Sequence, residues 1–373
     1  MTALHALRLI VIGPLPPPVY GVTVSTSLVL ANQHLRERFS VEHLDTSDHR
    51  TGVNIGRWDL TNVLLGISAV VRVNRLLAGE RGIVYVPISQ STGGFLRDSM
   101  FIRSAARRGW KVVGHLRGGE FSEFYARQPR LSQRWIRLTL KKLSSMAVMG
   151  SSLRSLFDGL VPDERIAVVP NGTPDIDQDG FKRDPGTVLF LSNLMPRKGI
   201  VEAVETALKV LESCPDARFL FVGESRDAEL DRRLHERARS AGDSIRFLPE
   251  AGDEEKRRLL LSSSLLLFPP IAPEGHPRVV LEAIAAGLPV VATNQGAIAE
   301  TVTDGECGFV LDEPATDQLA DRVIQLLGDA DLRQRMGRAA RARYLAEFTE
   351  EAASRRFADW LTEVATLQST AGG

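Results

Sequence analysis

Two glutamates eight positions apart, Glu274 and Glu282, form the most specific chemical pattern in the sequence. Glu274 follows the apolar run 265–269, and Pro277 and Gly287 suit the start and the end of a helix that contains Glu282. Free N–H groups at the start of such a helix can hold a diphosphate. A carboxylate beside them can accept hydrogen bonds from sugar hydroxyls, and a second one along the helix from a ribose.

A simpler interpretation of the pair stays open. Glu274 can be an acid favoured by the helix dipole, and Glu282 a solvated helix residue. Against this, Glu282 stands between Leu281 and Ala283 in a strongly apolar helix, where an unpaired carboxylate is costly to bury. This setting favours a binding role for the pair.

Two further loops contain residues that suit a phosphate. Lys198 lies between an apolar run and a helix expected to begin near Ile200, and its ammonium group can neutralise phosphate, with Arg197 sharing that role. The alternative is a solvated basic loop. Gly21, after a proline-rich loop, lets the backbone approach a bound group. That loop is not G-x-G-x-x-G, so a nicotinamide cofactor is not favoured.

The elements that position these residues alternate between short apolar runs and segments of helical periodicity, which is typical of parallel strands covered on both faces by helices. We expect an α/β fold of two doubly wound, Rossmann-like domains facing each other across a cleft, with the boundary in the turn-rich segment 171–180, near Gln178. The expected strands are 7–13, 82–88, 111–116, 146–150 and 166–170, then 187–192, 218–223, 244–248, 264–269, 289–293 and 308–311; helices are expected at 317–327, 331–347 and 350–367.

Composition sets the class of protein. The 373 residues are 43% hydrophobic and 25% charged, as in globular proteins of two domains. Cys214 and Cys307 are not spaced as the ligands of a metal site would be. The longest apolar run, 60–71, is shorter than the ~20 residues of a membrane-spanning helix. We therefore expect a cytoplasmic protein. Residues 1–178 hold 22 basic against 14 acidic residues, and the rest 24 against 32. The first half therefore suits an anionic partner.

Several segments together resemble the donor-binding region of the large retaining glycosyltransferase family 4, which has the GT-B fold. They are the run 274–300, the segment 304–309, the loop that ends at Gly21, Asn171-Gly172, the loop 197–199 and the segment 221–224. The resemblance implies an N-terminal acceptor domain, 1–178, joined by a returning C-terminal helix, 350–373. It also implies a C-terminal donor domain, 179–349.

The resemblance assigns roles residue by residue. Glu274 would lie against the donor sugar, Glu282 would bind the ribose and Lys198 the diphosphate. The remaining donor-binding candidates are Gly275, His276 and Pro277 through their backbone, and Arg197, Asn193, Gly21, Gly223, Phe247 and Glu250, of which Phe247 to Glu250 would flank the base. No metal or cofactor is expected, because lysine, helix dipole and backbone N–H groups would stabilise the leaving diphosphate.

The sequence departs from the family pattern at three places. Asn193 stands where the family usually has Arg, Tyr20 precedes Gly21 where it has a second glycine, and Arg117 stands where it has a cleft histidine. His115 is two residues earlier and points the same way, because strand residues alternate faces. Either side chain would reach the donor sugar. These departures keep open a catalytically silent, nucleotide-sugar-binding relative, and a nucleotide-sugar epimerase is the other alternative.

The first half also contains a basic stripe at helical spacing. Leu131, Trp135 and Leu138 flank it, as in a surface that rests on anionic lipid. The alternative is a solvated helix face with Trp135 buried, and nucleic acid is not expected because no aromatic stacking platform accompanies the charge. The stripe consists of Arg127, Arg130, Arg134, Arg137 and Lys141.

Together, the pattern and the resemblance imply a retaining enzyme of glycan synthesis. It would move a sugar from a UDP- or GDP-sugar to a glycan or lipid-linked glycan in bacterial-type cell-surface polysaccharide or glycoconjugate synthesis. It would work in the cytoplasm, at the inner face of the membrane.

Overall fold

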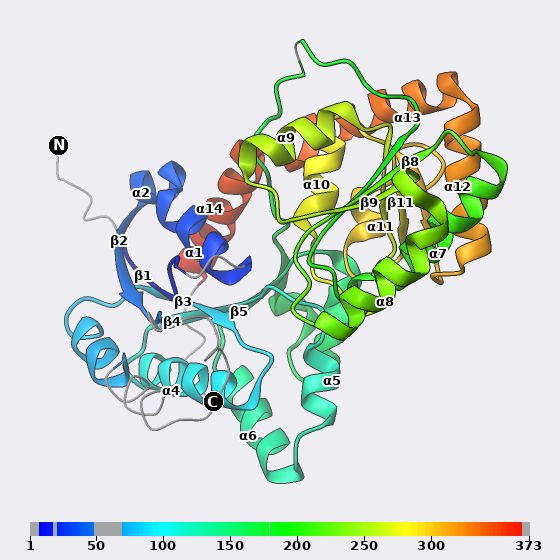
Figure 1. Cartoon of the computed structure of the whole chain (residues 1–373). Helices are drawn as coiled ribbons and strands as arrows, with labels where there is room; N and C mark the ends of the chain where they lie inside the picture. Colours follow the sequence, from blue (N-terminus) through cyan, green and yellow to red (C-terminus); the bar gives the residue numbers. More distant parts are fainter. Residues whose placement is uncertain (1–6, 18–20, 48–68, 179, 368–373) are drawn as a thin grey trace. The chain divides into compact units, whose positions relative to one another are not determined.

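The computed structural model describes residues 7–17, 21–47, 69–178 and 180–367, which form two compact units. One unit runs to Pro170 and takes up the chain again from Ala353, and the other is Asn171–Ala352 (Figure 1). The turn-rich segment packs with the second unit, where Ile176 joins the core and Asp175 pairs with Arg341. The division therefore falls at residue 170, not near Gln178.

The first unit contains a six-stranded parallel sheet in the order β2-β1-β3-β4-β5-β6. The strands are β1 (Leu7–Gly13), β2 (Phe39–Asp45), β3 (Ile83–Ile88), β4 (Lys111–Leu116), β5 (Ser145–Val148) and β6 (Ile166–Val168). Its helices include α1 (Gly21–Ala31), α2 (Gln33–Arg38), α4 (Thr92–Arg107), α5 (Phe121–Ala126) and α6 (Arg130–Leu140).

The C-terminal helix α14 (Glu350–Thr366) completes the first unit. Phe357 and Trp360 are buried against one face of the sheet, and the indole N–H of Trp360 donates to Ser145 Oγ at 2.9 Å. The ammonium group of Lys111 donates to the carbonyl of Ala365 at 2.7 Å, at the negative end of the helix dipole. The predicted return of this helix is confirmed.

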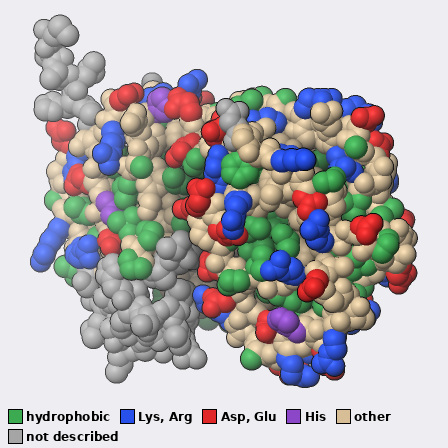
Figure 2. All heavy atoms as spheres, turned by 45° about the horizontal axis from the view of Figure 1, so that its top comes forward, with side chains coloured by type: hydrophobic (Ala, Val, Ile, Leu, Met, Phe, Trp, Pro, Cys, Tyr) green, Lys and Arg blue, Asp and Glu red, His purple; other side chains and the backbone are tan. Residues whose placement is uncertain are grey.

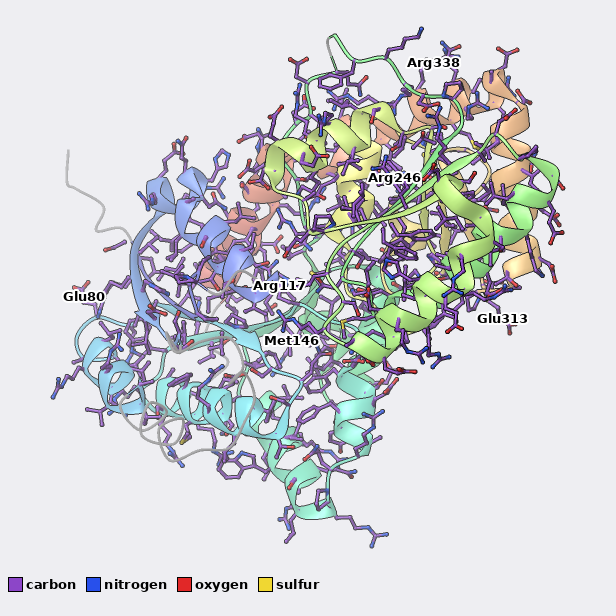
Figure 3. All side chains as sticks on the ribbon, in the orientation of Figure 1. Glu80, Arg117, Met146, Arg246, Glu313 and Arg338 are labelled. Carbon is purple, nitrogen blue, oxygen red and sulfur yellow. The ribbon has the colours of Figure 1, made fainter. Side chains whose placement is uncertain are left out.

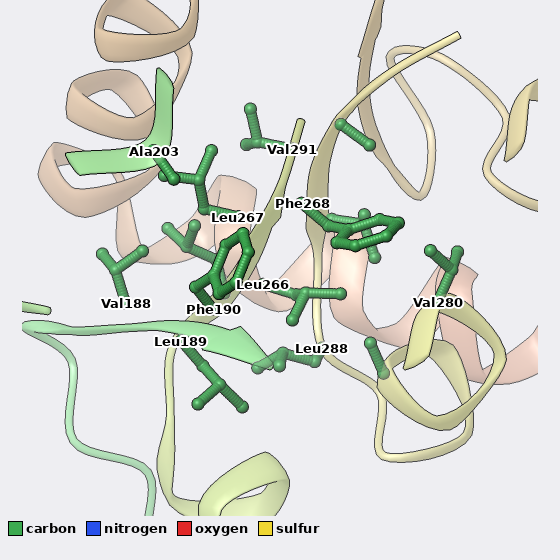
Figure 4. Packing of buried hydrophobic residues seen from close by; sticks show 14 of the residues in the cluster. Val188, Leu189, Phe190, Ala203, Leu266, Leu267, Phe268, Val280, Leu288 and Val291 are labelled. Carbon is green, nitrogen blue, oxygen red and sulfur yellow. The ribbon is translucent and has the colours of Figure 1, made fainter. Parts of the chain in front are cut away.

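The second unit contains a second six-stranded parallel sheet, in the order β12-β11-β10-β7-β8-β9. Its core packs β7 (Thr187–Leu191) and β10 (Leu265–Phe268) against α7 (Ile200–Ser213) and α10 (Arg278–Ala285) (Figure 4). The strands are β7 (Thr187–Leu191), β8 (Arg218–Val222), β9 (Ile245–Leu248), β10 (Leu265–Phe268), β11 (Val290–Thr293) and β12 (Gly308–Leu311). The helices are α7 (Ile200–Ser213), α8 (Ala228–Ala238), α9 (Asp253–Ser262), α10 (Arg278–Ala285), α11 (Ile298–Thr301), α12 (Thr316–Gly328) and α13 (Ala330–Arg343).

One strand, β2, was not predicted. It pairs only with β1, at the edge of the sheet, and its residues Ser40, Glu42 and His43 interrupt any apolar run. The sequence search relied on continuous apolar runs, which identify strands buried on both faces and not a half-exposed edge strand.

Candidate functional site

Two of the residues predicted to meet the donor, Lys198 and Glu274, lie at the switch point of the second sheet. Strand order reverses between β7 and β10, and ligands of open α/β sheets bind beyond the carboxyl ends of the strands at such a point. Lys198 follows β7 and Glu274 follows β10. Lys198 Nζ donates to Glu274 Oε1 at 2.6 Å, with 25% and 11% of the two side chains exposed.

The backbone holds these two loops together. Gly199 has φ +77°, and an added Cβ would lie 1.8 Å from the carbonyl oxygen of Pro269 at the end of β10. The amides of Ile271 and Ala272 both donate to the carbonyl of Arg197 at 3.2 Å. The Lys198 loop therefore rests directly on the chain that leads to Glu274.

A third segment supports the Glu274 loop from behind. Gly296 has φ +60°, and a Cβ there would lie 2.2 Å from the carbonyl oxygen of Glu274. The amide of Ala297 donates to the carbonyl of Gly275 at 2.9 Å. The loop then turns at Pro277 into α10, and Gly287, with φ +66°, ends that segment as predicted.

Glu282 lies inside α10 and is paired with a residue that the sequence analysis missed. Lys256 Nζ, on α9, donates to Glu282 Oε1 at 2.9 Å, and only 13% of the Glu282 side chain is exposed. The pairing explains how a carboxylate is tolerated in an apolar helix. One feature of the sequence could have identified Lys256. It lies near the start of the helix that follows β9, at the carboxyl ends of the strands, where Glu274 also lies.

The structure narrows the prediction for His276. Its side chain is 4% exposed, and both ring nitrogens bond to neighbouring protein groups, Asn171 and Thr301. The imidazole therefore faces the interior of the unit. If His276 contacts a donor, the contact is made by its main chain.

Four other predicted residues of this unit lie on strands of the second sheet or directly after them. Gly223, after β8, fits so closely that a Cβ would lie 1.9 Å from the carbonyl oxygen of Ser192. Asn193 is exposed in the loop after β7, and Glu250 is exposed after β9. Phe247, on β9, packs its ring 5.3 Å from that of Phe221, which leaves it half-buried at the sheet.

In the first unit, His115 and Arg117 point to the same side, as strand alternation predicts. Arg117 donates to the hydroxyl of Tyr85 at 3.1 Å, and His115 Nδ1 lies 3.3 Å from the same hydroxyl. His115 is fully buried among aromatic rings, Phe357 and Trp360 included. The prediction that His115 reaches a sugar does not fit this position, and Arg117, just beyond β4 (Figure 3), remains the candidate.

Burial also decides the charge of His115. Loss of solvent, together with the guanidinium of Arg117, lowers the pKa of His115 well below its ordinary value. The ring is therefore neutral at pH 7.

Gly21 begins α1 after β1, with open space where its Cβ would stand, and Tyr20 lies outside the described residues.

The basic stripe lies on α6 and on the residues directly after α5 and α6. Its five members are exposed, and Leu131, beside them, is 83% exposed. Trp135 is partly covered by protein, with 38% of its surface exposed. The guanidinium of Arg103 lies over its ring at 4.1 Å, and its indole N–H donates to Ser99 Oγ at 3.0 Å. Within the described residues, no helix has the length and apolarity to cross a membrane.

The surface of the second unit differs from the basic stripe of the first unit. On the face drawn in Figure 2, basic and acidic side chains are interspersed over most of the described surface. A groove of about 650 Å³ between α7 and α8 has an apolar floor that includes Val204 and Leu234, and Arg233 and Glu205 on its walls. It contains none of the predicted site residues.

The arrangement suits an anionic, hydroxyl-bearing ligand. Each carboxylate is neutralised by a lysine, so the site keeps no large net charge that would have to be buried. A diphosphate can compete with Glu274 for Lys198, while sugar hydroxyls can donate to the carboxylate that is released. In the part of the chain that the structure describes, no three His, Cys, Asp or Glu side chains gather as metal ligands would.

Two parallel-sheet units, the second with its candidate site at the switch point, define the class: the chain has the GT-B fold of glycosyltransferases. The solved structure of Anabaena HepE in complex with UDP superposes with a TM-score of 0.73 at 19% identity, covering 96% of this chain and 100% of that one. A glycosyltransferase from Rickettsia africae gives 0.72 at 15% identity, covering 97% and 100%.

Sequence comparison agrees with the fold. Residues 173–343 match the family described as "Glycosyl transferases group 1". A "GDP-mannose-dependent alpha-(1-6)-phosphatidylinositol monomannoside mannosyltransferase" of Mycobacterium tuberculosis is 30% identical over 211 residues, 50% of this chain and 54% of the relative. The "phosphatidyl-myo-inositol mannosyltransferase" of the same species is 34% identical over 191 residues, 47% and 49%. The chain thus spans about half the length of these curated relatives. The match of residues 173–343 agrees with the resemblance to glycosyltransferases noted in the sequence.

Proposed function

We propose that the protein is a retaining glycosyltransferase that uses a nucleoside-diphosphate sugar and no metal. The observation that carries the proposal is the Lys198–Glu274 pair at 2.6 Å, at the switch point of the second sheet, with Glu282 further along the helix that follows Glu274. Lys198 stabilises the diphosphate, Glu274 positions the donor sugar and Glu282 accepts hydrogen bonds from the ribose. The backbone of Gly275, His276 and Pro277 contacts the ligand at the start of α10.

The proposed reaction needs no side chain as a base. The bond between the sugar C1 and the phosphate oxygen breaks, and the acceptor oxygen bonds to the same face of C1. The proton of the acceptor hydroxyl passes to an oxygen of the departing phosphate, and the nucleoside diphosphate leaves. Lys198 lowers the barrier by stabilising charge that develops on that leaving group.

Turnover of the donor tests the proposal. Wild type, Glu274→Ala and Glu313→Gln are incubated with GDP-mannose or UDP-glucose, and the released nucleotide and sugar are measured. We expect Glu274→Ala to lose at least about 10²-fold in rate. The exposed Glu313, on the second unit (Figure 3), serves as the control and keeps wild-type rate. If no donor gives Glu274-dependent turnover, the protein is not this enzyme.

We propose a GDP-sugar as the donor and a lipid-linked glycan as the acceptor. Support comes from the relatives, whose names give GDP-mannose and phosphatidylinositol mannosides, whereas HepE was solved with UDP. Calorimetric titration with GDP and with UDP separates the two bases, since the preferred one should bind at least tenfold more tightly.

A silent, nucleotide-sugar-binding relative is the second candidate. The exposed Asn193, in the loop that leads to Lys198, places an amide where the family resemblance implies a cation. If calorimetry shows nucleotide binding while the turnover assay stays blank, this second function replaces the first. A product sugar that remains attached to its nucleotide would instead identify an epimerase.

We also propose that the α5–α6 face rests on anionic membrane, at the inner face where a lipid-linked acceptor would lie. Exposed Leu131 and the five basic residues provide apolar contact and charge. Arg130→Ala/Arg134→Ala should weaken binding to phosphatidylglycerol vesicles about 30-fold, at ~1 kcal/mol for each cation. The matched control is Arg335→Ala/Arg338→Ala on α13, also exposed, and an equal loss there would contradict the assignment.

A further inference from the structure

The segment by which the chain enters the second unit is bonded to the segment by which it leaves. Thr173 and Thr349 form a parallel bridge, in which the amide of Thr173 donates to the carbonyl of Phe348 at 3.1 Å. The amide of Glu350 donates back to the carbonyl of Thr173 at 3.0 Å. The hydroxyl of Tyr344 donates to that same carbonyl at 3.0 Å. We call residues 171–173 the entry segment.

The entry segment is also bonded to the Glu274 loop, through His276. The amide of Asn171 donates to His276 Nδ1 at 3.0 Å, and the side-chain amide of Asn171 donates to the carbonyl of His276 at 3.0 Å. On the other side of the ring, Nε2 lies 2.8 Å from Thr301 Oγ1. Asn171 therefore donates two hydrogen bonds to His276, one from its main chain to the ring and one from its side chain to the main chain.

These contacts define the state of the ring. The hydroxyl of Thr301 donates its proton to the carbonyl of Ala297 at 2.8 Å, so it accepts from His276 Nε2. Nδ1 accepts from Asn171, and Nε2 carries the hydrogen. A neutral imidazole satisfies both partners, and a phenyl ring of similar shape would remove the acceptor that Nδ1 offers to the amide of Asn171.

We propose that His276 is a positioning residue that couples the entry segment to the donor loop. Through its ring it holds the main chain of Gly275–Pro277 in the conformation that receives the diphosphate, and it transmits occupancy of that loop to Asn171. This inference rests on the proposed function, because it assumes that the loop binds a nucleotide.

The competing explanation is that His276 only fills the core. Its ring lies 5.5 Å from that of Phe348 in an edge-to-face arrangement, which an apolar aromatic residue would reproduce. The two explanations differ for His276→Phe. Core filling predicts unchanged nucleotide binding, whereas positioning predicts weaker binding in a protein that remains folded.

Calorimetric titration with GDP and UDP tests the inference on the full chain. We expect His276→Phe to raise the Kd of the preferred nucleotide about tenfold. His276→Asn, whose side-chain oxygen can take the place of Nδ1, should restore at least half of the lost free energy. Asn171→Ala should raise the Kd less than His276→Phe, and the double variant less than the product of the two effects. His34→Phe, in α2 of the first unit, is the control and should bind as wild type.

Amide exchange gives a readout that core filling would not move. In wild type, GDP or UDP should slow hydrogen exchange in the peptide that contains Asn171–Thr173. In His276→Phe and in Asn171→Ala, saturating nucleotide should leave that exchange unchanged while still protecting the Lys198 loop.

The outcomes separate the two proposals. If wild type binds neither nucleotide, the proposed function fails. If wild type binds and His276→Phe binds equally well, the function stands and the positioning role is wrong. If His276→Phe does not fold, His276→Asn and Asn171→Ala decide: wild-type binding and exchange in Asn171→Ala would overturn the coupling.

Discussion

At the scale of single residues, the site is a set of carboxylates each held by a lysine. Glu274 is paired with Lys198, and Glu282 with Lys256. Such pairs keep acidic side chains in place before a ligand arrives, since an unpaired carboxylate with little exposure carries a desolvation cost. The lysines are therefore as much a part of the site as the glutamates.

Removal of Lys256 tests this dependence. Lys256→Met leaves Glu282 without its cation, and we expect the free energy of unfolding to fall by about 1–3 kcal/mol. Lys256→Met/Glu282→Leu, which removes both charges, should regain most of that loss. Denaturant unfolding of the two variants measures the difference. Equal stability of the single variant and wild type would show that the pair is only a solvated contact.

The buried imidazole of His115 gives a pH prediction. An unfolded histidine takes up a proton near pH 6.5, whereas the low pKa of folded His115 keeps it neutral, so below that pH the unfolded chain binds more protons. Stability should fall as the pH drops, by up to about 1.4 kcal/mol per pH unit from this group. Urea unfolding of wild type and His115→Phe between pH 7 and 5 should give a shallower slope in the variant. Parallel slopes would contradict a neutral, buried ring.

Sequence reasoning succeeded at residues whose spacing is itself the signal. The eight-residue interval between the two glutamates predicted that Glu274 lies in a loop after a strand and that Glu282 lies in the helix that follows. The position of Lys198 after an apolar run predicted its place in a loop after a strand. Sequence reasoning did not predict that Lys256 meets Glu282, since their contact joins positions 26 apart through the stacking of two helices. Nor did it predict the burial of His276 and His115, because a histidine in a sequence does not reveal what covers it.

At the scale of elements, the site depends on how closely loops approach strand ends. Among the residues that the structure describes, the alternation of apolar runs and helices predicted eleven of the strands and missed the half-exposed edge strand β2. At Gly199 the Lys198 loop comes closest to the chain that follows β10. Gly199 has a left-handed conformation, which is strained for a residue with a side chain. The Lys198 loop can lie on β10 only because this position has no Cβ.

Substitution of Gly199 should therefore separate the two loops. Gly199→Ala is expected to lower the free energy of unfolding by more than about 1 kcal/mol and to weaken GDP or UDP binding. Gly328→Ala, the last residue of α12, is the matched control: its φ lies outside the left-handed region, and a Cβ there meets no atom within 4 Å. It should leave stability unchanged or raise it slightly. Calorimetry and thermal unfolding measure both effects, and similar behaviour of the two variants would rule out the close approach as the cause.

At the scale of the whole molecule, two separate cores share one chain. The second unit has its own core, and the candidate donor residues belong to it, with the exception of Gly21 and Arg117. A ligand that binds one unit stabilises only the unfolding transition of that unit. The two units should therefore respond differently to nucleotide.

Differential scanning calorimetry tests this difference. At a nucleotide concentration of 100 times the Kd, binding adds about 2.7 kcal/mol to the stability of the binding unit. We expect the preferred nucleotide to raise the Tm of one transition, and that shift to be smaller in Lys198→Ala, while the other transition stays in place. A shift of the transition that His115→Phe alters would place the nucleotide in the first unit instead.

The return of α14 to the first sheet has a consequence for biosynthesis. A ribosome completes strands β1 to β6 long before it makes Phe357 and Trp360, which cover one face of that sheet. The nascent first unit therefore presents an uncovered apolar face while the whole second unit is translated, and a truncated chain that stops before α14 would present it permanently. A circular permutant that begins at Ala353 would supply this helix first, and should depend less on chaperones.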